Sequence, residues 1–161
     1  MRHSPEYAPS VAYYLFNVVP DAVSGPALRD EATRCLRIGM WGIDDDEPHR
    51  DALAAGDLAL VYVGAPERTF IGRVEVASAA HRWTPSEAQR YPGGASGGVL
   101  LSRLREWDPP VPMSAVLPRI GSEKARADFD KAVVRITRDE YETALAVAAE
   151  RRENRSVDPA G

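Results

Sequence analysis

The chain has 161 residues, a length that fits one domain with a buried core. Its 20 Lys and Arg residues against 24 Asp and Glu residues give a formal charge of -4, which argues against strong non-specific binding to duplex nucleic acid. No apolar run is long enough for a membrane span and no secretory apolar core opens the chain, so we expect a cytoplasmic protein. The lone Cys35 excludes an intramolecular disulfide and a thiolate zinc cluster.

The first part of the chain predicts a leader, a strand and a helix. Residues 1–10 have several turn formers and no hydrophobic period, so we expect them to be flexible. Residues 11–19 are rich in β-branched and aromatic side chains and stop at Pro20, which predicts a largely buried strand. Residues 26–36 place apolar side chains at helical spacing behind Ser24, a candidate cap, and so predict a helix.

An acidic run, residues 44–47, precedes Pro48 and a stretch that ends at Gly56. Acids before a proline at the first helical position, with glycine just past the end, predict a short helix over residues 49–55. A metal site is the alternative for the acids. Consecutive carboxylates on a bare loop do not fix octahedral geometry and no second ligand cluster is present, so we expect no metal.

The middle of the chain predicts three strands and one long loop. Residues 57–63 and 69–78 are joined by a turn and predict a hairpin whose second strand has one buried face. Residues 79–98 form the longest irregular segment. Its glycines lack the strand, helix and Lys-Ser pair of a phosphate cradle, so we expect a mobile loop. Residues 99–107 predict a strand ended by Asp108-Pro109-Pro110, with one face made of Val99, Leu101, Arg103, Arg105 and Trp107.

The C-terminal part predicts further helices around one strand. Residues 111–120 allow at most one helical turn, residues 122–129 predict a short helix, and residues 132–136 predict a strand. Thr137 with Glu140 three residues later is a capping box that begins a last helix. The expected apolar stripe of that helix is Tyr141, Ala144, Leu145 and Ala148. From Arg151 onward we expect a polar tail, so one domain covers residues 11–150.

The sequence offers no recognisable catalytic constellation. His3, His49 and His81 fall in separate segments, and neither a Gly-x-Ser-x-Gly elbow nor a His-Glu-x-x-His motif is present. We therefore expect a protein that is not an enzyme and needs no cofactor. An enzyme that acts on nucleic acid remains the weakest of three functional alternatives.

The aromatic residues are more informative because most lie in the first two thirds of the chain, several of them where a strand meets a loop. A flat base stacks on such a ring for about 1 to 3 kcal/mol without needing net positive charge. Most of these rings are expected to pack in the core. Trp41 differs, because it lies in a turn-like segment between Met40 and Gly42, where a large ring is hard to bury.

Five ordered motifs across residues 11–148 resemble those of one family. They are Tyr13-Tyr14-Leu15-Phe16-Asn17 with Pro20-Asp21, Trp41-Gly42-Ile43, Gly56 to Tyr62 followed by Ile71 to Val76, Arg103 to Pro112, and Val134 to Thr137. In this order they resemble the EVE domain family of the PUA-like superfamily, which also includes the YTH and ASCH domains. The resemblance implies an α+β fold, a PUA-like mixed β pseudo-barrel of five to six strands flanked by helices.

The resemblance also implies a pocket for a modified or flipped-out nucleobase. By matched position its residues are Phe16, Asn17, Trp41, Gly42, Ile43, Tyr62 and Trp83, with His81 and Arg82 as rim or backbone contacts. Asn17 is the expected reader of the base edge, since its amide has donors and an acceptor. The implied partner is modified DNA or RNA, together with a nuclease or an RNA-processing protein, and no metal or membrane.

The sequence departs from the family pattern at three places. Where many relatives carry an Arg-Asn pair, this chain has Asp44-Asp45-Asp46, which weakens phosphate contact there. Tyr14 stands in place of a tryptophan. Trp107 stands in place of an aliphatic residue, and we expect it in the core. The acidity favours a second hypothesis. In it the protein binds a free nucleoside or another small molecule, or serves as a protein-interaction subunit.

Overall fold

The computed structural model describes residues 10–18, 25–64, 67–120 and 131–157. The predicted leader except residue 10, the candidate cap Ser24 and the predicted helix over 122–129 lie outside these residues. Among the described helices, none combines the length and the apolar character needed to span a bilayer.

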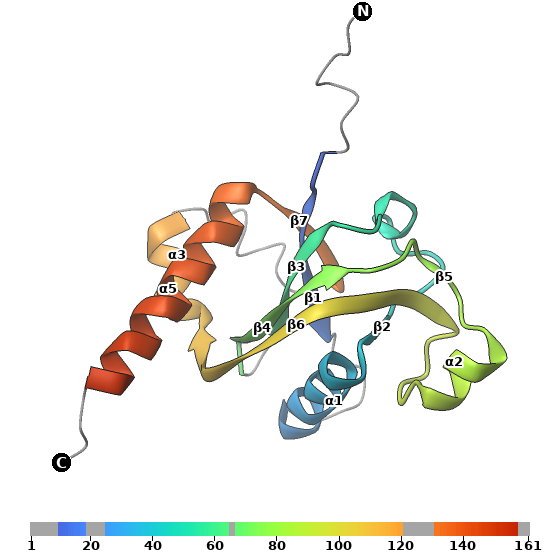
Figure 1. The fold of residues 1–161 in the computed structure, drawn as a ribbon, viewed down its shortest axis with the longest axis horizontal. Coiled ribbons are helices and arrows are strands. Elements are labelled where there is room, and N and C mark those ends of the chain that lie inside the picture. The colour runs from blue at the N-terminus through green and yellow to red at the C-terminus, as the bar shows by residue number, and fades with distance from the viewer. Residues whose placement is uncertain (1–9, 19–24, 65–66, 121–130, 158–161) are drawn as a thin grey trace, which may run out of the picture.

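A single curled sheet organises the described chain (Figure 1). Its strands are β1 (Tyr13–Val18), β2 (Met40–Gly42), β3 (Leu58–Val63), β4 (Thr69–Val76), β5 (His81–Arg82), β6 (Gly97–Pro112) and β7 (Val133–Ile136). They follow the order β2-β6-β4-β3-β1-β7, and the short β5 also pairs with β6. The β1–β3 pair is parallel and the other pairs are antiparallel. The predicted α+β class, with a mixed half-barrel flanked by helices, is confirmed.

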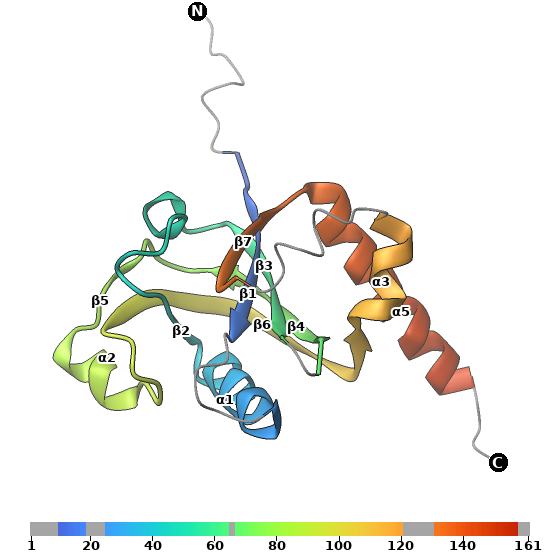
Figure 2. The same ribbon diagram turned by 180° about the vertical axis from the view of Figure 1, so that it is seen from behind.

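Helices cover both faces of this sheet (Figures 1 and 2). They are α1 (Gly25–Ile38), the 3-10 turn η2 (Arg50–Ala52), α2 (Pro85–Arg90), α3 (Met113–Ile120) and α5 (Arg138–Val157). Helix α1 packs on β1, β2 and β3, while α5 packs on α3, β6 and β1. Both views place α2 and α5 at opposite ends of the long strand β6.

Two hydrophobic cores result, one on each face of the sheet. Alternation along β1 sends Tyr14 and Phe16 to the first core, under α1, and Leu15 to the second core, under α3 and α5. Cys35 of α1 lies in the first core, as a small buried helix residue should. Tyr62, Phe70 and Tyr141 are the large rings of the second core.

The last helix begins as predicted and runs further than predicted. The Thr137 N–H donates to Glu140 Oε1 at 2.8 Å, and the Glu140 N–H donates to Thr137 Oγ1 at 3.0 Å, which confirms the capping box. The helix continues to Val157, so much of the predicted tail is helical. The predicted helix over 49–55 is only the turn η2, whereas α3 has eight residues where at most one turn was predicted.

Strand β6 passes through the prolines that were predicted to end it. Its partner β4 pairs Phe70 with Val111 and Gly72 with Glu106, so residues 107–110 lie outside the ladder. Proline has no backbone N–H to donate, and no ladder bond is needed from Pro109 or Pro110 in this stretch. The strand therefore continues to Pro112.

A β-bulge at Arg103 reverses the side-chain alternation of β6. Arg73 pairs with Arg105 and Glu75 pairs with Ser102, so β6 carries one extra residue, and Arg103 takes a left-handed φ of 51°. Before the bulge Val99 and Leu101 belong to the first core, whereas after it Trp107 packs at the edge of the second core. The predicted common face from Val99 to Trp107 is therefore wrong, and Trp107 is half-buried rather than a core residue.

Candidate functional site

The structure divides the predicted pocket residues between several places. Six of the seven are buried, with exposed fractions of 0 to 7%: Phe16, Asn17, Trp41, Ile43, Tyr62 and Trp83. Phe16, Trp41 and Ile43 belong to the first core, while Tyr62 stacks at a tilt on Phe70 in the second core. Asn17 lies near the end of β1, where a Cβ on Gly64 would come within 3.1 Å of its amide oxygen. The seven residues do not surround one open pocket.

Trp41 is a core residue on a strand. Its ring stacks on Phe16 with centroids 5.8 Å apart and planes 17° apart, and Phe16 stacks in turn on Tyr14. The expectation that a ring in this segment is hard to bury is wrong for two reasons. Gly39, at a φ of 77°, lets the chain turn from α1 into β2, and Gly98 has no Cβ to strike the Trp41 carbonyl oxygen. Strand β2 can therefore lie against β6 with the ring inside.

The segment 79–98 was predicted as a mobile loop and contains β5 and α2 instead. Helix α2 begins with a capping box, in which Thr84 Oγ1 accepts from the Glu87 N–H at 3.2 Å and the Thr84 N–H donates to Glu87 Oε1 at 3.0 Å. Pro85 occupies the first helical position. The sequence signal that could have predicted this helix is Thr-Pro-Ser-Glu, a capping box with proline inside it.

The later glycines of this segment allow strands to approach. A Cβ at Gly97 would strike the carbonyl oxygen of His81, and a Cβ at Gly98 would strike that of Trp41. They sit where β6 meets β5 and β2. Glycine at these positions therefore serves strand pairing, not loop mobility.

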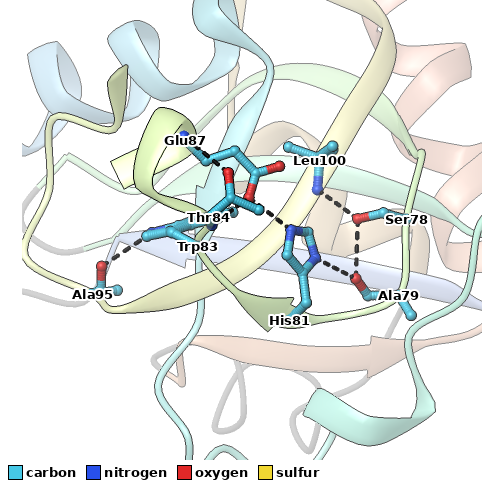
Figure 3. Close-up of polar contacts among 8 residues, drawn as sticks. All are labelled: Ser78, Ala79, His81, Trp83, Thr84, Glu87, Ala95 and Leu100. Atoms are coloured by element: carbon cyan, nitrogen blue, oxygen red, sulfur yellow. Dashed lines mark hydrogen bonds and ion pairs between the residues drawn. The ribbon is translucent and has the colours of Figure 1, made fainter. Parts of the chain in front are cut away.

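Around β5 and α2 the structure gathers a set of polar and aromatic residues with one glycine, which we name the β5–α2 cluster: Gly42, His81, Arg82, Trp83, Glu87 and Tyr91. Figure 3 shows His81, Trp83 and Glu87 of this set. The Trp83 indole N–H donates to the Ala95 carbonyl at 3.0 Å. Its ring meets His81 edge-on at 5.7 Å and Tyr91 at 5.1 Å. The Gly42 N–H donates to the Tyr91 hydroxyl at 3.0 Å, and a Cβ at Gly42 would overlap that hydroxyl.

His81 is held between two acceptors. Its Nδ1 lies 3.0 Å from the Ala79 carbonyl oxygen, and its Nε2 lies 2.9 Å from Glu87 Oε1. Only the doubly protonated ring donates to both, and the Ala79 carbonyl, followed by Glu87, raises the pKa of His81 above its ordinary value. The Thr84 backbone N–H, followed by His81, lowers the pKa of Glu87. The cluster thus favours an imidazolium next to the exposed Arg82.

This arrangement is unsuited to proton abstraction. A general base needs a free lone pair, whereas both ring nitrogens of His81 face acceptors. The Ser78 hydroxyl, also drawn in Figure 3, donates to the Ala79 carbonyl and accepts from the Leu100 N–H, both at 3.0 Å. Neither side chain is placed to activate the other.

Metal and thiol chemistry find little support in the part of the chain that is described. No group of three or more His, Cys, Asp or Glu residues there is arranged to hold a metal ion. Burial raises the pKa of the Cys35 thiol to about 11. A thiol with this pKa is almost wholly protonated near neutral pH and is a poor nucleophile.

No protein-family model matches the sequence, and no curated protein matches it. Solved structures do match. A hypothetical protein from Leishmania major has a TM-score of 0.64 and 15% identity, covering 89% of this chain and 98% of that one. Human THYN1, in complex with 5-methylcytosine containing DNA, has a TM-score of 0.57 and 12% identity, covering 85% and 97%. A mutant of the ASCH protein from Zymomonas mobilis has a TM-score of 0.53 and 11% identity, covering 86% and 98%.

The chain has the PUA-like fold. This confirms the architecture that the motif resemblance implied. The likeness extends to both THYN1 and an ASCH protein at low identity, so membership of the PUA-like superfamily, and of the EVE family within it, stays a prediction.

Proposed function

We propose that the protein is a non-catalytic binding module for nucleic acid that accepts one modified or flipped-out base. One observation carries the proposal. The fold matches human THYN1 over 85% of this chain and 97% of that one, and THYN1 is seen in complex with 5-methylcytosine containing DNA. A flipped base needs a rigid, partly aromatic site at the end of a scaffold. The half-barrel offers such a site where the β5–α2 cluster lies at one end of β6.

The β5–α2 cluster supports the proposal through its local charge. Arg82 is exposed on β5 and forms no ion pair within the described ranges, whereas the adjacent His81 pairs with Glu87, and Arg50 pairs with Asp45 and Asp51. Phosphate contacts fix the register of a bound strand and are made by such cations and by backbone N–H groups. Arg82 is therefore the cation of the cluster that we propose contacts a phosphate, although the whole chain carries a charge of -4.

The aromatic part of the cluster supports base recognition. Trp83 is 7% exposed and Tyr91 is half-buried, and the centroids of the two rings lie 5.1 Å apart. Stacking of one base on the outer edge of this pair would add to the phosphate contacts. We propose that Trp83, His81 and Arg82 remain functional residues, and that Phe16, Trp41, Ile43 and Tyr62 serve by building the scaffold.

The absence of catalysis is part of the proposal. It rests on His81, whose two nitrogens are engaged by the Ala79 carbonyl and by Glu87. A nuclease or an RNA-processing protein as partner stays a prediction from the motif resemblance.

Fluorescence anisotropy with single-stranded oligonucleotides tests the proposal. The probes carry either cytosine or 5-methylcytosine at one position, and the proteins are the native chain, Arg82→Ala and a matched control, Arg138→Ala. Arg138 is an exposed arginine on α5 that pairs with Glu142. We expect tighter binding of the modified probe, several-fold weaker binding by Arg82→Ala, and native affinity for the control. Equal affinities for both probes and all three proteins would overturn the proposal.

A free nucleoside is a second candidate ligand. The observation that favours it is the run of exposed acids, Asp44 to Asp46, which follows Gly42 and Ile43 and repels phosphate. Thermal unfolding with nucleosides and with oligonucleotides separates the two ligands. Stabilisation by 5-methylcytidine without stabilisation by the oligonucleotide would support the free nucleoside.

A further inference from the structure

A hollow of about 210 Å³ lies between the C-terminal half of β6 and helix α5. The residues that define it are Arg73 of β4, Arg105, Trp107 and Asp108 of β6, and Leu145 and Arg152 of α5. Arg105 lies eight residues along β6 from Gly97, where the β5–α2 cluster begins, which corresponds to about 26 Å of extended strand. The hollow is therefore distinct from that cluster, and helices α5 and α2, which flank them, lie at opposite ends of β6 (Figures 1 and 2).

The bulge at Arg103 creates this hollow. Regular alternation would send Arg105 and Trp107 to the same face as Val99 and Leu101, in the first core. The extra residue turns both side chains to the face covered by α5. Bulges often re-aim side chains at binding sites, and here one places a ring and a guanidinium in the same depression.

The charge balance of the hollow favours an anion. Three guanidinium groups and one carboxylate, that of Asp108, line it. The acids nearest in sequence are engaged elsewhere, since Glu75 pairs with Arg103 at 3.4 Å and Glu106 pairs with Arg37 at 3.0 Å. Within the described ranges, no ion pair engages Arg105 or Arg152. Several arginines around one depression suit the oxygens of a phosphate group.

The remaining lining suits a flat ring. Trp107 is half-buried and packs at the edge of the second core, as does Leu145 across the hollow. An indole next to guanidinium groups is the pairing that holds a nucleobase beside its phosphate. The volume is below the range of about 300 to 1,000 Å³ typical of drug-sized ligands, so the hollow accommodates part of one nucleotide and no longer segment.

We propose that this hollow is a nucleotide-binding site, in which Arg73, Arg105 and Arg152 hold the phosphate and the base lies against Trp107. The nucleotide is either free or part of a strand. The free form is independent of the proposed function, whereas the strand form rests on it and adds a second contact at the far end of β6.

NMR titration with adenosine 5′-monophosphate, adenosine and a twelve-residue single-stranded oligonucleotide tests the site. The reporter is the indole N–H resonance of Trp107, assigned by its loss in Trp107→Phe. The variants are the double substitution Arg105→Gln with Arg152→Gln, and Arg138→Gln as an exposed control. We expect the monophosphate to shift the Trp107 resonance, adenosine to bind more weakly, and the double variant to weaken binding by at least about tenfold, because hydrogen bonds to charged groups are strong.

The outcomes separate this site from the β5–α2 cluster. A Trp107 shift with the oligonucleotide but not with the monophosphate supports the strand form, and the reverse supports the free form. No shift with either probe at millimolar concentration, or equal affinity in the double variant, overturns the inference. Failure of Arg82→Ala to weaken oligonucleotide binding would contradict the proposed function and leave the monophosphate result intact.

Discussion

Replacing Trp41 by alanine should destabilise the fold and should not act as a selective loss of ligand binding. The ring is 4% exposed and stacks on Phe16 at 5.8 Å, inside the first core. A tryptophan removed from such a site leaves a cavity that the close-packed residues of the first core cannot readily fill.

The size of the effect follows from burial. A buried aromatic side chain removes about 150 to 250 Å² from water, which at about 25 cal/mol per Å² gives an upper bound of about 4 to 6 kcal/mol. Measured Trp and Phe to Ala changes in protein cores cost about 3 to 5 kcal/mol, and loss of the ring pair is included in that range. We expect Trp41→Ala to lower the free energy of unfolding by about 4 kcal/mol, a large part of the roughly 5 to 15 kcal/mol that is typical of a whole domain.

Urea unfolding followed by circular dichroism measures this loss. The native chain, Trp41→Ala, Trp41→Phe and Arg82→Ala form the series, with Arg82→Ala expected within about 0.5 kcal/mol of the native chain because its side chain is exposed. Trp41→Phe should keep the stack and retain oligonucleotide binding. If Trp41→Ala lowered the free energy of unfolding by less than about 1 kcal/mol, and the folded variant no longer bound the oligonucleotide, Trp41 would face a ligand.

Three further predictions follow from the geometry. Gly98→Ala should cost about 1 to 3 kcal/mol in urea unfolding because its Cβ overlaps the facing strand, whereas Gly94→Ala, which points into open space, should change stability by less than about 0.5 kcal/mol; equal effects would contradict the pairing. Cys35, with a thiol pKa of about 11, should resist a disulfide reagent at pH 8 in the folded chain and react in urea; fast labelling of the native state would contradict its burial. The pKa of His81 is raised and that of Glu87 is lowered, so their pairing stabilises fully between a pH of about 4.5 and about 6.5 and is lost as the pH rises through the folded-state pKa of His81; a stability difference between the native chain and His81→Gln that does not narrow as the pH rises above about 6.5 would refute this.

The sequence predicted the elements whose signals are local. The strand over 11–19, the hairpin strands and the helix that begins with Thr137 and Glu140 were all found, because β-branched runs, hydrophobic spacing and capping residues act within a few positions. Helix α2 was equally predictable from the capping residues Thr84 and Glu87, but the glycines that follow in the same segment led to the prediction of a loop.

The arrangement of the site was not predictable in the same way. Which face of the sheet a side chain occupies depends on the bulge at Arg103, and a left-handed arginine has no local sequence signal. Trp41 lies in the core because Gly98, far along the chain, lets two strands meet closely. Matching motifs one by one therefore found residues of the right type, such as Trp83 and His81, without showing that Tyr62 and Trp41 lie on opposite faces.

Amide hydrogen exchange of the native chain, with and without a single-stranded oligonucleotide that carries 5-methylcytosine, tests the central claim most directly. Binding at the β5–α2 cluster predicts slower exchange in residues 81–98 and unchanged exchange in the core strand β3. An oligonucleotide that leaves residues 81–98 unprotected at saturating concentration would contradict the claim.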